Sequence, residues 1–599
     1  MFTLIRYAYR VAPVSALLVF ALAILSAALG VLMTVLIGQA VGAVPDVVSG
    51  RSGAMSASMF TLLVVGVSVA LIFTSSLPAF QQSARQVLLN HVRRDITINL
   101  VVPLLRPNGM AHLEDSVVLD QAERADLETS FGFQLRTGLE SVPILVSSRL
   151  LLLGSAGLVG QLFSWWVAVG LAAVALFMEW YQGWAVSAEL DAMYGHTDDG
   201  RKQGYLWELS MRDALKELRV FGLGAWLVKR HDLAFRAIFA PTWRARRKRL
   251  WKSLPVSLLH LGVHGLAIFL VGRAALAGRL PIGQVATIVL AILAVGASHS
   301  GWAAIHVKRG LTSYRAMRAL PDLIARRHPE RAVKRLPMSS EKALPQWSIR
   351  FEDVSFRYPG ADVDVLCGLN LEIPAGRALA LVGINGAGKS TLVKLLTGMY
   401  EPTCGRITVD GIDLRELELP TWQRQVATIV QDFARFPLSA ADNVMLGSTG
   451  DARDVQALRR VAAQSGFDKV INGLPDAWNT ILDKTFEGGV ELSGGEWQRV
   501  ALTRALFAVA SGASVLVLDE PAAALDVRAE AELVERYLDL TTGVTSLIIS
   551  HRFSVVRDAH CICVMDGGEI AESGTHEELL AADARYARMF TLQAERYAE

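Results

Sequence analysis

The stretch LVGINGAGKSTLVKLL, residues 381–396, holds three glycines and a lysine between two apolar runs. Gly383 is followed after four residues by Gly388, Lys389 and Ser390, which is the spacing of a phosphate-binding loop. The run before the glycines predicts a buried strand and the run after them a helix, the setting that this motif requires. Backbone N–H groups of such a loop point at phosphate oxygens, and the helix N-terminus adds a positive dipole. The stretch therefore predicts a nucleotide site in an α/β domain.

Two side chains of this loop and two acids further along carry the expected chemistry. Lys389 is expected to reach the β- and γ-phosphates, and the Ser390 hydroxyl to ligate Mg²⁺. Asp519 and Glu520 end the apolar run SVLVLDE. A carboxylate at the C-terminal edge of a parallel strand lies where ligands bind in such sheets. We therefore expect Asp519 to hold Mg²⁺ and Glu520 to polarise the water that attacks ATP.

After residue 347 the sequence alternates short apolar runs with helical stretches. SIRFEDVSFRY at 348–358 alternates as a half-buried strand does, and the apolar runs at 378–383 and 545–551 are typical of buried strands. Such alternation indicates a largely parallel core. We expect an α/β P-loop ATPase domain over residues 348–599. Residues 328–347, with three prolines and many charges, are expected to form a linker before it.

The first half of the 599-residue chain has a different pattern, with long apolar segments. About 20 apolar residues in a helix cross a bilayer. We expect an α-helical membrane domain with six spans over residues 1–327, embedded in lipid. The predicted spans lie at about 14–42, 58–81, 142–162, 164–187, 254–278 and 282–305.

The loops between these spans predict the orientation of the chain. Residues 188–253 hold fourteen Lys or Arg, and residues 82–141 hold six Arg among many acids, whereas the short connections contain almost none. Basic loops remain on the cytoplasmic side. We therefore expect a multi-pass protein of the inner (plasma) membrane with both termini in the cytoplasm. The long cytoplasmic loops are amphipathic and are expected to be helical.

Net charge and cysteine content argue against two other classes of protein. A net charge of +2 indicates a nearly neutral protein overall, so no nucleic-acid partner is expected. Four cysteines in a chain of this length do not form a disulfide scaffold. Cys561 and Cys563 would share one face of a strand, and a metal site would need more ligands than these two. We interpret them as packing residues.

The segment LSGGEWQR at 492–499 resembles the signature sequence of ABC ATPases. Gln431 after ATIV, the ALD at 524–526, His551 after LIIS and Tyr358 stand in the order that this family has. The resemblance covers about 348–590. With six spans in front, the whole chain resembles an ABC exporter half-transporter.

This resemblance implies a mechanism in which two nucleotide domains close head to tail on two ATPs. Each ATP then lies between the P-loop of one chain and the signature of the other. The signature offers backbone N–H groups at a helix start, a second anion cradle. The resemblance assigns Glu520, His551 and Gln431 to catalysis, and Ser390, Gln431 and Asp519 to Mg²⁺. The ATP contacts that it implies are Tyr358, Gly383, Asn385, Gly386, Gly388, Lys389, Ser390, Thr391, Ser493, Gly494, Gly495 and Asp526.

Two positions depart from the family pattern. Glu496 follows SGG where Gln is commoner, and PAAALD lacks the usual Ser before Ala-Leu-Asp. Neither change removes a phosphate ligand. We expect a hydrolysing subunit that pairs with a second half-transporter chain, a copy of itself being favoured over a different chain.

The transported molecule is not readable from the motifs. We expect export of a small hydrophobic or peptide-like molecule, because ELRVFGLGAWLVKRH at 217–231 resembles bacterial exporters of modified peptides. A lipid flippase, an exporter of amphipathic drugs, or an importer built on the exporter fold as for siderophores remains an alternative. The segments Leu113–Ser116 and Tyr205–Ser210 are candidates for the contacts that couple the two domains.

A few polar residues lie inside the predicted spans. Arg149 and Glu179 are about 13 and 16 residues from a tight hairpin between antiparallel spans, so their heights differ by about 5 Å. We predict an ion pair, with a position in the substrate cavity or at the membrane interface as the alternative for either residue. His260 and His264 share a helix face. Interhelical hydrogen bonding, or a position near the lipid headgroups, is the favoured interpretation for them, with substrate contact or pH sensing as the alternative. The sequence leaves the role of His299 open.

Overall fold

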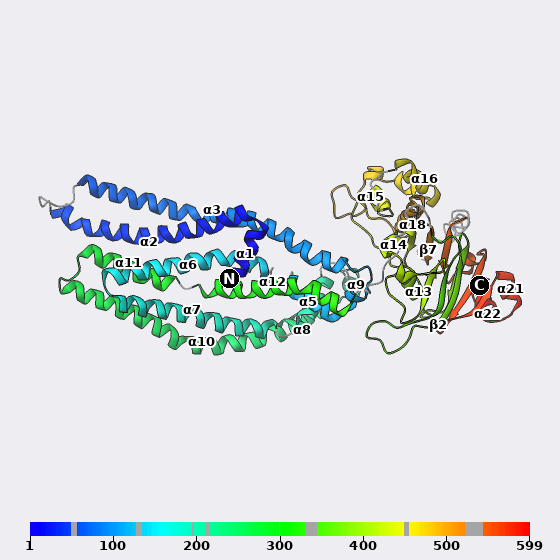
Figure 1. The fold of residues 1–599 in the computed structure, drawn as a ribbon, viewed down its shortest axis with the longest axis horizontal. Helices are drawn as coiled ribbons and strands as arrows, with labels where there is room; N and C mark the ends of the chain where they lie inside the picture. Colours follow the sequence, from blue (N-terminus) through cyan, green and yellow to red (C-terminus); the bar gives the residue numbers. More distant parts are fainter. Residues whose placement is uncertain are drawn as a thin grey trace. The chain divides into compact units, whose positions relative to one another are not determined.

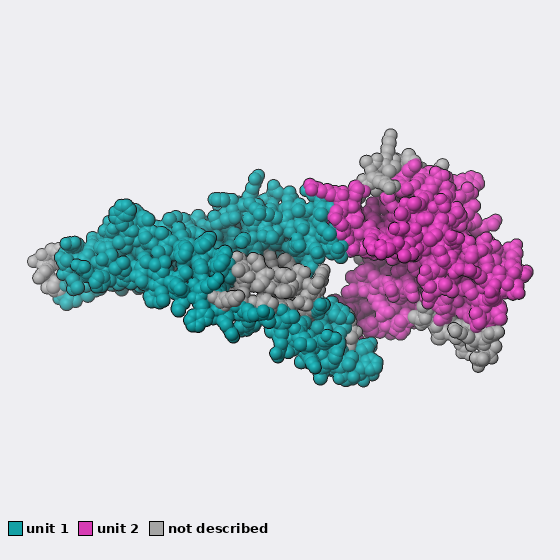
Figure 2. Space-filling view, turned by 90° about the horizontal axis from the view of Figure 1, so that it is seen from below, with its two compact units in different colours: residues 1–104, 116–323 teal, residues 105–115, 324–599 magenta. Residues whose placement is uncertain are grey.

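The computed structural model describes residues 1–49, 57–126, 134–194, 197–210, 215–298, 300–329, 344–448, 454–520 and 543–598. The chain divides into two compact units, shown in Figure 2. The first unit comprises Met1–Leu104 and Ser116–Leu323, and the second comprises Leu105–Asp115 and Ile324–Glu599. Most of the predicted linker, residues 330–343, lies outside the described residues.

Long helices form the first half of the chain and run side by side (Figure 1). Their described members are α1 (Phe2–Val11), α2 (Pro13–Ser49), α3 (Ala57–Leu105), α5 (Ser116–Asp126), α6 (Gln134–Leu162), α7 (Trp165–Tyr194), α8 (Thr197–Glu208), α9 (Leu215–Val220), α10 (Gly224–Leu276), α11 (Ile282–Ala297) and α12 (Gly301–Arg327). As predicted, α3 and α10 continue well beyond the apolar segments into the basic loops.

Within the described residues, five helices are long and apolar enough to cross a membrane. They are Pro13–Pro45, Ser58–Leu105, Leu135–Leu162, Arg249–Leu276 and Ile282–Arg327. The fourth predicted span lies on α7, which has 30 residues, carries Glu179 and Gln182, and is not one of these five. The last of the five contains a break between α11 and α12.

The first unit has an apolar core where α6, α7, α10 and α11 meet. Leu171, Ile288 and Ile292 are fully buried there. On another side, α2 approaches α11 closely because both carry small residues. A Cβ on Gly42 would lie 2.8 Å from the Cα of Gly283, so only glycine permits this approach.

The second unit is built on two sheets. The first is antiparallel in the order β2–β1–β4–β5. The second has the order β10–β9–β3–β8–β7–β6 and is parallel except for the edge strand β10, which confirms the predicted parallel core. The strands are β1 (Ser348–Phe356), β2 (Leu366–Pro374), β3 (Ala378–Gly383), β4 (Cys404–Val409), β5 (Ile412–Asp413), β6 (Val426–Ile429), β7 (Val515–Asp519), β8 (Thr545–Ile549), β9 (Cys561–Asp566) and β10 (Glu569–Gly574).

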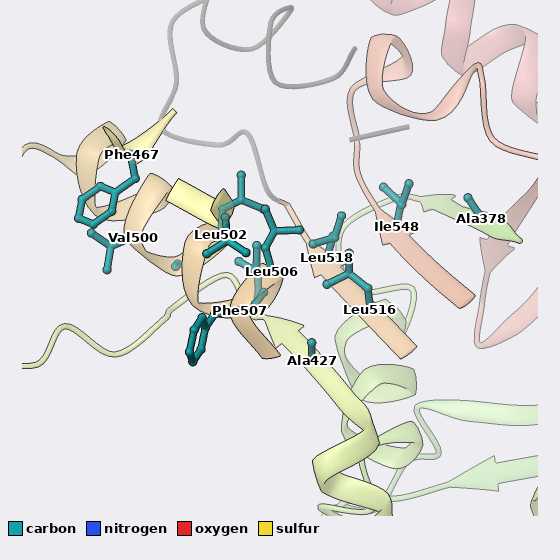
Figure 3. Packing of buried hydrophobic residues seen from close by; sticks show 14 of the residues in the cluster. Ala378, Ala427, Phe467, Val500, Leu502, Leu506, Phe507, Leu516, Leu518 and Ile548 are labelled. Atoms are coloured by element: carbon teal, nitrogen blue, oxygen red, sulfur yellow. The ribbon is translucent and has the colours of Figure 1, made fainter. Parts of the chain in front are cut away.

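Both faces of the parallel sheet are covered, because alternate strand residues point into two separate cores. Leu516 and Leu518 of β7 pack against Leu502 and Leu506 of α18, as Figure 3 shows. Cys563 is buried in the other core with Cys561 packed against it, as expected. The described helices of this unit are α4 (Ala111–Glu114), α13 (Lys389–Leu396), α14 (Leu419–Gln425), α15 (Ala440–Met445), α16 (Val455–Ser465), α17 (Phe467–Ile471), α18 (Gly494–Ala510), α20 (Phe553–Val556), α21 (His576–Ala581) and α22 (Arg585–Ala598).

Candidate functional site

The loop between β3 and α13 has the conformation that its glycines allow. Gly386 and Gly388 have φ of +84° and +103°, values that side chains other than glycine rarely adopt. A Cβ on Gly388 would also lie 2.7 Å from Leu366 Cδ2. The loop therefore curls tightly before α13 begins at Lys389, and its N–H groups precede a helix N-terminus.

Lys389 is buried at the start of α13. Its Nζ donates to the carbonyl oxygens of Gly383 at 2.8 Å and Ile384 at 2.9 Å. Burial lowers the pKa of Lys389, while the nearby carboxylates of Glu520 and Asp519 oppose that change. The ammonium group is thus held against the loop, next to the expected position of the phosphates.

Ser390 and Asp519 meet at the carboxyl edge of the parallel sheet. The Ser390 hydroxyl donates to Asp519 Oδ2 at 3.0 Å. Asp519 is buried at the end of β7, and burial is the main reason why its pKa is raised. A hydroxyl and a carboxylate in contact are oxygen ligands of the kind that Mg²⁺ prefers, so these residues fit a Mg²⁺ site.

Glu520 and His551 follow the adjacent parallel strands β7 and β8. Glu520 has φ of +52°, and its N–H donates to the carbonyl oxygen of Ile549 at 2.9 Å. Its Oε1 lies 3.2 Å from Nδ1 of His551. A glutamate in this backbone region is strained, and such strain is concentrated at functional sites. The sheet therefore places an acid and an imidazole side by side.

These groups line one cavity of about 700 Å³. Eleven predicted site residues line it together, and they are Gly383, Asn385, Gly386, Gly388, Lys389, Ser390, Thr391, Gln431, Asp519, Glu520 and His551. Sequence reasoning missed Val365, Ile384 and Met589, which also line it. Ile384 stands inside the quoted motif. Val365 and Met589 belong to no motif, and only the fold brings them here.

Tyr358 is not among the described residues that line this cavity. Its hydroxyl lies 3.0 Å from Thr391 Oγ1, and Lys394 Nζ lies 5.1 Å from the centre of its ring. The ring also makes edge contacts with Phe356 and Tyr400. Tyr358 therefore sits beside α13, and its stacking on adenine stays a prediction.

The signature residues start α18, on a separate part of the second unit. Ser493 Oγ accepts from the N–H of Glu496, and Glu496 Oε2 accepts from the N–H of Ser493 at 2.8 Å, which is a capping box. Glu496 thus caps the helix, a role that either glutamate or glutamine can fill at this position. Of the described residues, the cavity lining includes neither Ser493 nor the two glycines after it. Asp526 lies outside the described residues.

The segment Leu105–Asp115, which includes α4, belongs to the second unit and contacts it directly. The N–H of Met110 donates to the carbonyl oxygen of Met399 at 2.8 Å, and Gln423 Nε2 donates to the carbonyl oxygen of Asn108 at 3.4 Å. The contacts thus begin before the predicted segment Leu113–Ser116. The other candidate, Tyr205–Ser210, lies at the end of α8 in the first unit.

Asp115 holds the end of α12 next to this segment. Its Oδ2 accepts from Arg327 Nε at 2.6 Å and lies 3.0 Å from His328 Nε2. These contacts fix the segment to Arg327 and His328 at the C-terminal end of α12.

The polar residues of the spans also find partners. Arg149 Nη2 of α6 lies 3.0 Å from Glu179 Oε1 of α7, which confirms the predicted ion pair. The rings of His260 and His264 are 4.1 Å apart, and His264 Nδ1 lies 2.9 Å from the carbonyl oxygen of His260. Both rings lie against Gly296 of α11, where a Cβ would come within 3.1 Å of His264. His299 lies outside the described residues.

Residues 366–523 match the family model described as "ABC transporter". The chain is 28% identical over 485 residues to the "Subtilin transport ATP-binding protein SpaT" of Bacillus subtilis, with 80% of this chain and 77% of that protein covered. It is 32% identical over 330 residues to an "ATP-dependent lipid A-core flippase" of Thiobacillus denitrificans, with 55% of this chain and 54% of that protein covered. The chain thus spans only about half the length of that flippase.

The fold is similar to a solved bacterial Atm1-family ABC exporter with ATP bound. The TM-score is 0.75 at 23% sequence identity, and the match covers 96% of this chain and 98% of that one. At this level of identity the similarity concerns the fold. It extends over both the helical half and the ATP-binding half of the chain.

Proposed function

Since residues 366–523 belong to the ABC transporter family and the whole chain has the fold of an ABC exporter, we propose that this protein hydrolyses ATP to move a molecule out of the cytoplasm. The observation that carries the proposal is the single cavity in which Lys389, the Ser390–Asp519 contact and the Glu520–His551 contact converge. ATP-binding and water-activating groups thus lie within reach of one ligand.

Each group in the cavity has one role in the proposed hydrolysis. Lys389 would exchange its carbonyl contacts for phosphate oxygens. Ser390, Asp519 and Gln431 would hold Mg²⁺, which neutralises phosphate charge when bound. Glu520 would accept the proton of the attacking water, and His551 would hold Glu520 and the γ-phosphate in place.

The signature leads us to propose a dimer. Ser493–Gly495 are exposed or partly exposed at the start of α18, and they do not line the cavity of their own chain. An anion cradle so placed is available to an ATP held by another chain. We favour two copies of this chain, because each copy would supply both a P-loop and a signature. Asp526 would join the same interface.

Coupling between ATP and transport is proposed to pass through Leu105–Asp115. This segment ends the long helix α3 and is hydrogen-bonded to the ATP-binding fold at Met399 and Gln423. A change in the nucleotide domain would therefore be carried directly to α3.

We propose a location in the inner (plasma) membrane with both termini in the cytoplasm. The basic loops 82–141 and 188–253 support this orientation. The apolar windows of the candidate spans on α2, α3 and α10 are only 22%, 11% and 17% buried, which supports covering by lipid or by the second chain.

For the transported molecule we favour a peptide-like compound. The match to the subtilin transport ATP-binding protein SpaT covers 77% of that protein, and its name concerns subtilin transport. The lipid A-core flippases share a shorter part of their length, so a lipid is the second candidate. An importer built on the same fold is the third.

Transport direction tests this proposal. The purified chain is reconstituted into sealed vesicles, and only chains whose nucleotide domains face outward receive ATP. Export predicts that ATP drives a labelled peptide into the vesicle lumen and that Lys389→Ala abolishes this accumulation. ATP-dependent loss of preloaded peptide would instead indicate import. Movement of labelled lipid between leaflets, without peptide uptake, would indicate a flippase.

A further inference from the structure

The C-terminal helix α22 packs one face against the loop that carries His551. Tyr586, Met589, Phe590 and Gln593 follow the spacing that places side chains on one side of a helix. Met589 lines the nucleotide cavity, and Tyr586 is fully buried. A helix with no nucleotide motif therefore borders the cavity and the loop after β8 together.

One contact between α22 and the loop that carries His551 is a hydrogen bond from the loop backbone. The N–H of Phe553 donates to Gln593 Oε1 at 3.0 Å. Phe553 is the first residue of the short helix α20, whose N-cap Arg552 makes no side-chain capping bond. The first N–H groups of a helix have no partner within it. Gln593 supplies that partner from 40 residues further along the chain.

The ring of Phe553 is held as well. It makes edge contacts with Tyr586 at 5.1 Å and Phe590 at 5.5 Å between ring centres. On the other side of the loop, Ser550 Oγ accepts from the N–H of Arg552 at 3.0 Å. The backbone on both sides of His551 is thus fixed, although the His551 side chain itself is half exposed.

The helix α22 is anchored in turn. Both carboxylate oxygens of Glu572 accept N–H bonds at its start, from Arg585 at 2.6 Å and Tyr586 at 3.1 Å. The Tyr586 hydroxyl lies 2.7 Å from His576 Nδ1, and burial raises the pKa of Tyr586 to about 12, so the phenol stays neutral. These contacts fix the position of α22, which packs against the loop that carries His551.

We propose that Gln593 is a positioning residue for His551. By capping α20 it holds the loop so that His551 stays within reach of Glu520, and this rests on the catalytic role proposed above for His551. Gln593 does not line the cavity, so it would act through the loop and not on ATP. Its loss should lower the rate of hydrolysis without weakening ATP binding.

Two substitutions separate the hydrogen bond from the bulk of the side chain. Gln593→Leu keeps the size and removes the acceptor, whereas Gln593→Glu keeps an acceptor. In the full-length chain in lipid, we expect Gln593→Leu to lower kcat for ATP about tenfold, given what an unsatisfied N–H costs, with KM for ATP unchanged. Gln593→Glu should stay within about twofold of the natural chain. Leu592→Ala, at an exposed neighbour on α22, is the matched control and should have no effect.

The decisive arm repeats Gln593→Leu in a chain that also carries His551→Ala. If Gln593 acts through His551, the second change should cause no further loss of rate. The inference would be overturned if Gln593→Leu lowered the ATPase rate by the same factor in the natural chain and in the His551→Ala chain. A full ATPase rate in Gln593→Leu alone would also overturn it. If His551→Ala slows hydrolysis and Gln593→Leu does not, only the positioning role fails. If His551→Ala keeps the full rate, the proposed role of His551 fails and the positioning role fails with it.

Discussion

At the scale of single residues, the buried carboxyl group of Asp519 makes a pH dependence predictable. Burial disfavours the ionised form, so the pKa of Asp519 lies above its ordinary value. The protonated form cannot ligate Mg²⁺. Affinity for Mg²⁺-ATP should therefore fall on acidification at a higher pH than an ordinary aspartate would cause. We would measure affinity for Mg²⁺-ATP between about pH 4 and pH 7, because ordinary aspartates titrate near the lower limit.

The control for this pH dependence is Asp519→Asn. It should bind Mg²⁺-ATP more weakly throughout and show a flatter dependence, since only the titration of ATP itself remains. If the two chains gave parallel curves, Asp519 would not be the titrating ligand.

A second residue-scale prediction concerns Tyr358. If adenine stacks on this ring, Tyr358→Ala should weaken nucleotide binding by about 5- to 150-fold, since base stacking contributes about 1–3 kcal/mol. Tyr358→Phe separates stacking from the hydroxyl contact with Thr391. Affinity close to that of the natural chain is expected for the Phe variant. Equal weakening in both variants would assign the effect to the hydroxyl, and unchanged affinity in Tyr358→Ala would remove the residue from the site.

At the scale of elements, the ion pair between α6 and α7 predicts an asymmetry between its two residues. The Glu179 side chain is 3% exposed and that of Arg149 is 43% exposed. Arg149→Met should cost about 3–5 kcal/mol of stability, because it removes the charge that compensates a buried carboxylate. Glu179→Gln should cost less, since the remaining arginine reaches a polar environment more easily.

The double variant Arg149→Met with Glu179→Gln should be more stable than Arg149→Met alone. Thermal unfolding in detergent would compare the three variants. A double variant no more stable than Arg149→Met would show that the two side chains do not compensate one another.

Local patterns in the sequence predicted the elements that carry the chemistry. The β3 strand has the bounds expected from ALALVG, and the acids Asp519 and Glu520 at the end of β7 lie at the sheet edge as expected. Spacing and periodicity are local properties, so such features can be read directly. On α7, Glu179 and Gln182 interrupt the apolar pattern at the point where the ion pair forms.

What the sequence did not predict depends on contacts between distant segments. Met589 lines the cavity, and Gln593 caps α20, but no residue spacing within α22 predicts either contact. The capping role of Glu496 could have been predicted, because a serine followed three residues later by glutamate at a helix start is a known pattern. The predicted segment Leu113–Ser116 was too short at its N-terminal side, since the contacts of Asn108 and Met110 use backbone groups whose residue type matters little.

At the scale of the whole molecule, we propose that two chains close on ATP and that hydrolysis reopens them. Closure requires both halves of each ATP site, the P-loop cavity of one chain and the α18 start of the other. A chain that binds ATP but cannot hydrolyse it should therefore remain closed as a dimer.

Glu520→Gln is the direct test, because it keeps the size and hydrogen bonding of the side chain but removes the base. The ATPase rate should fall about 10²–10⁴-fold. After removal of free nucleotide, the variant should retain two ATPs per dimer, and the distance between its nucleotide domains, measured by paired spin labels, should match a closed state. Asp519→Asn, which weakens metal binding, should retain no ATP and should show the distance of an open state. Full ATP turnover in Glu520→Gln, or slow turnover with no retained ATP and open domains, would contradict the account.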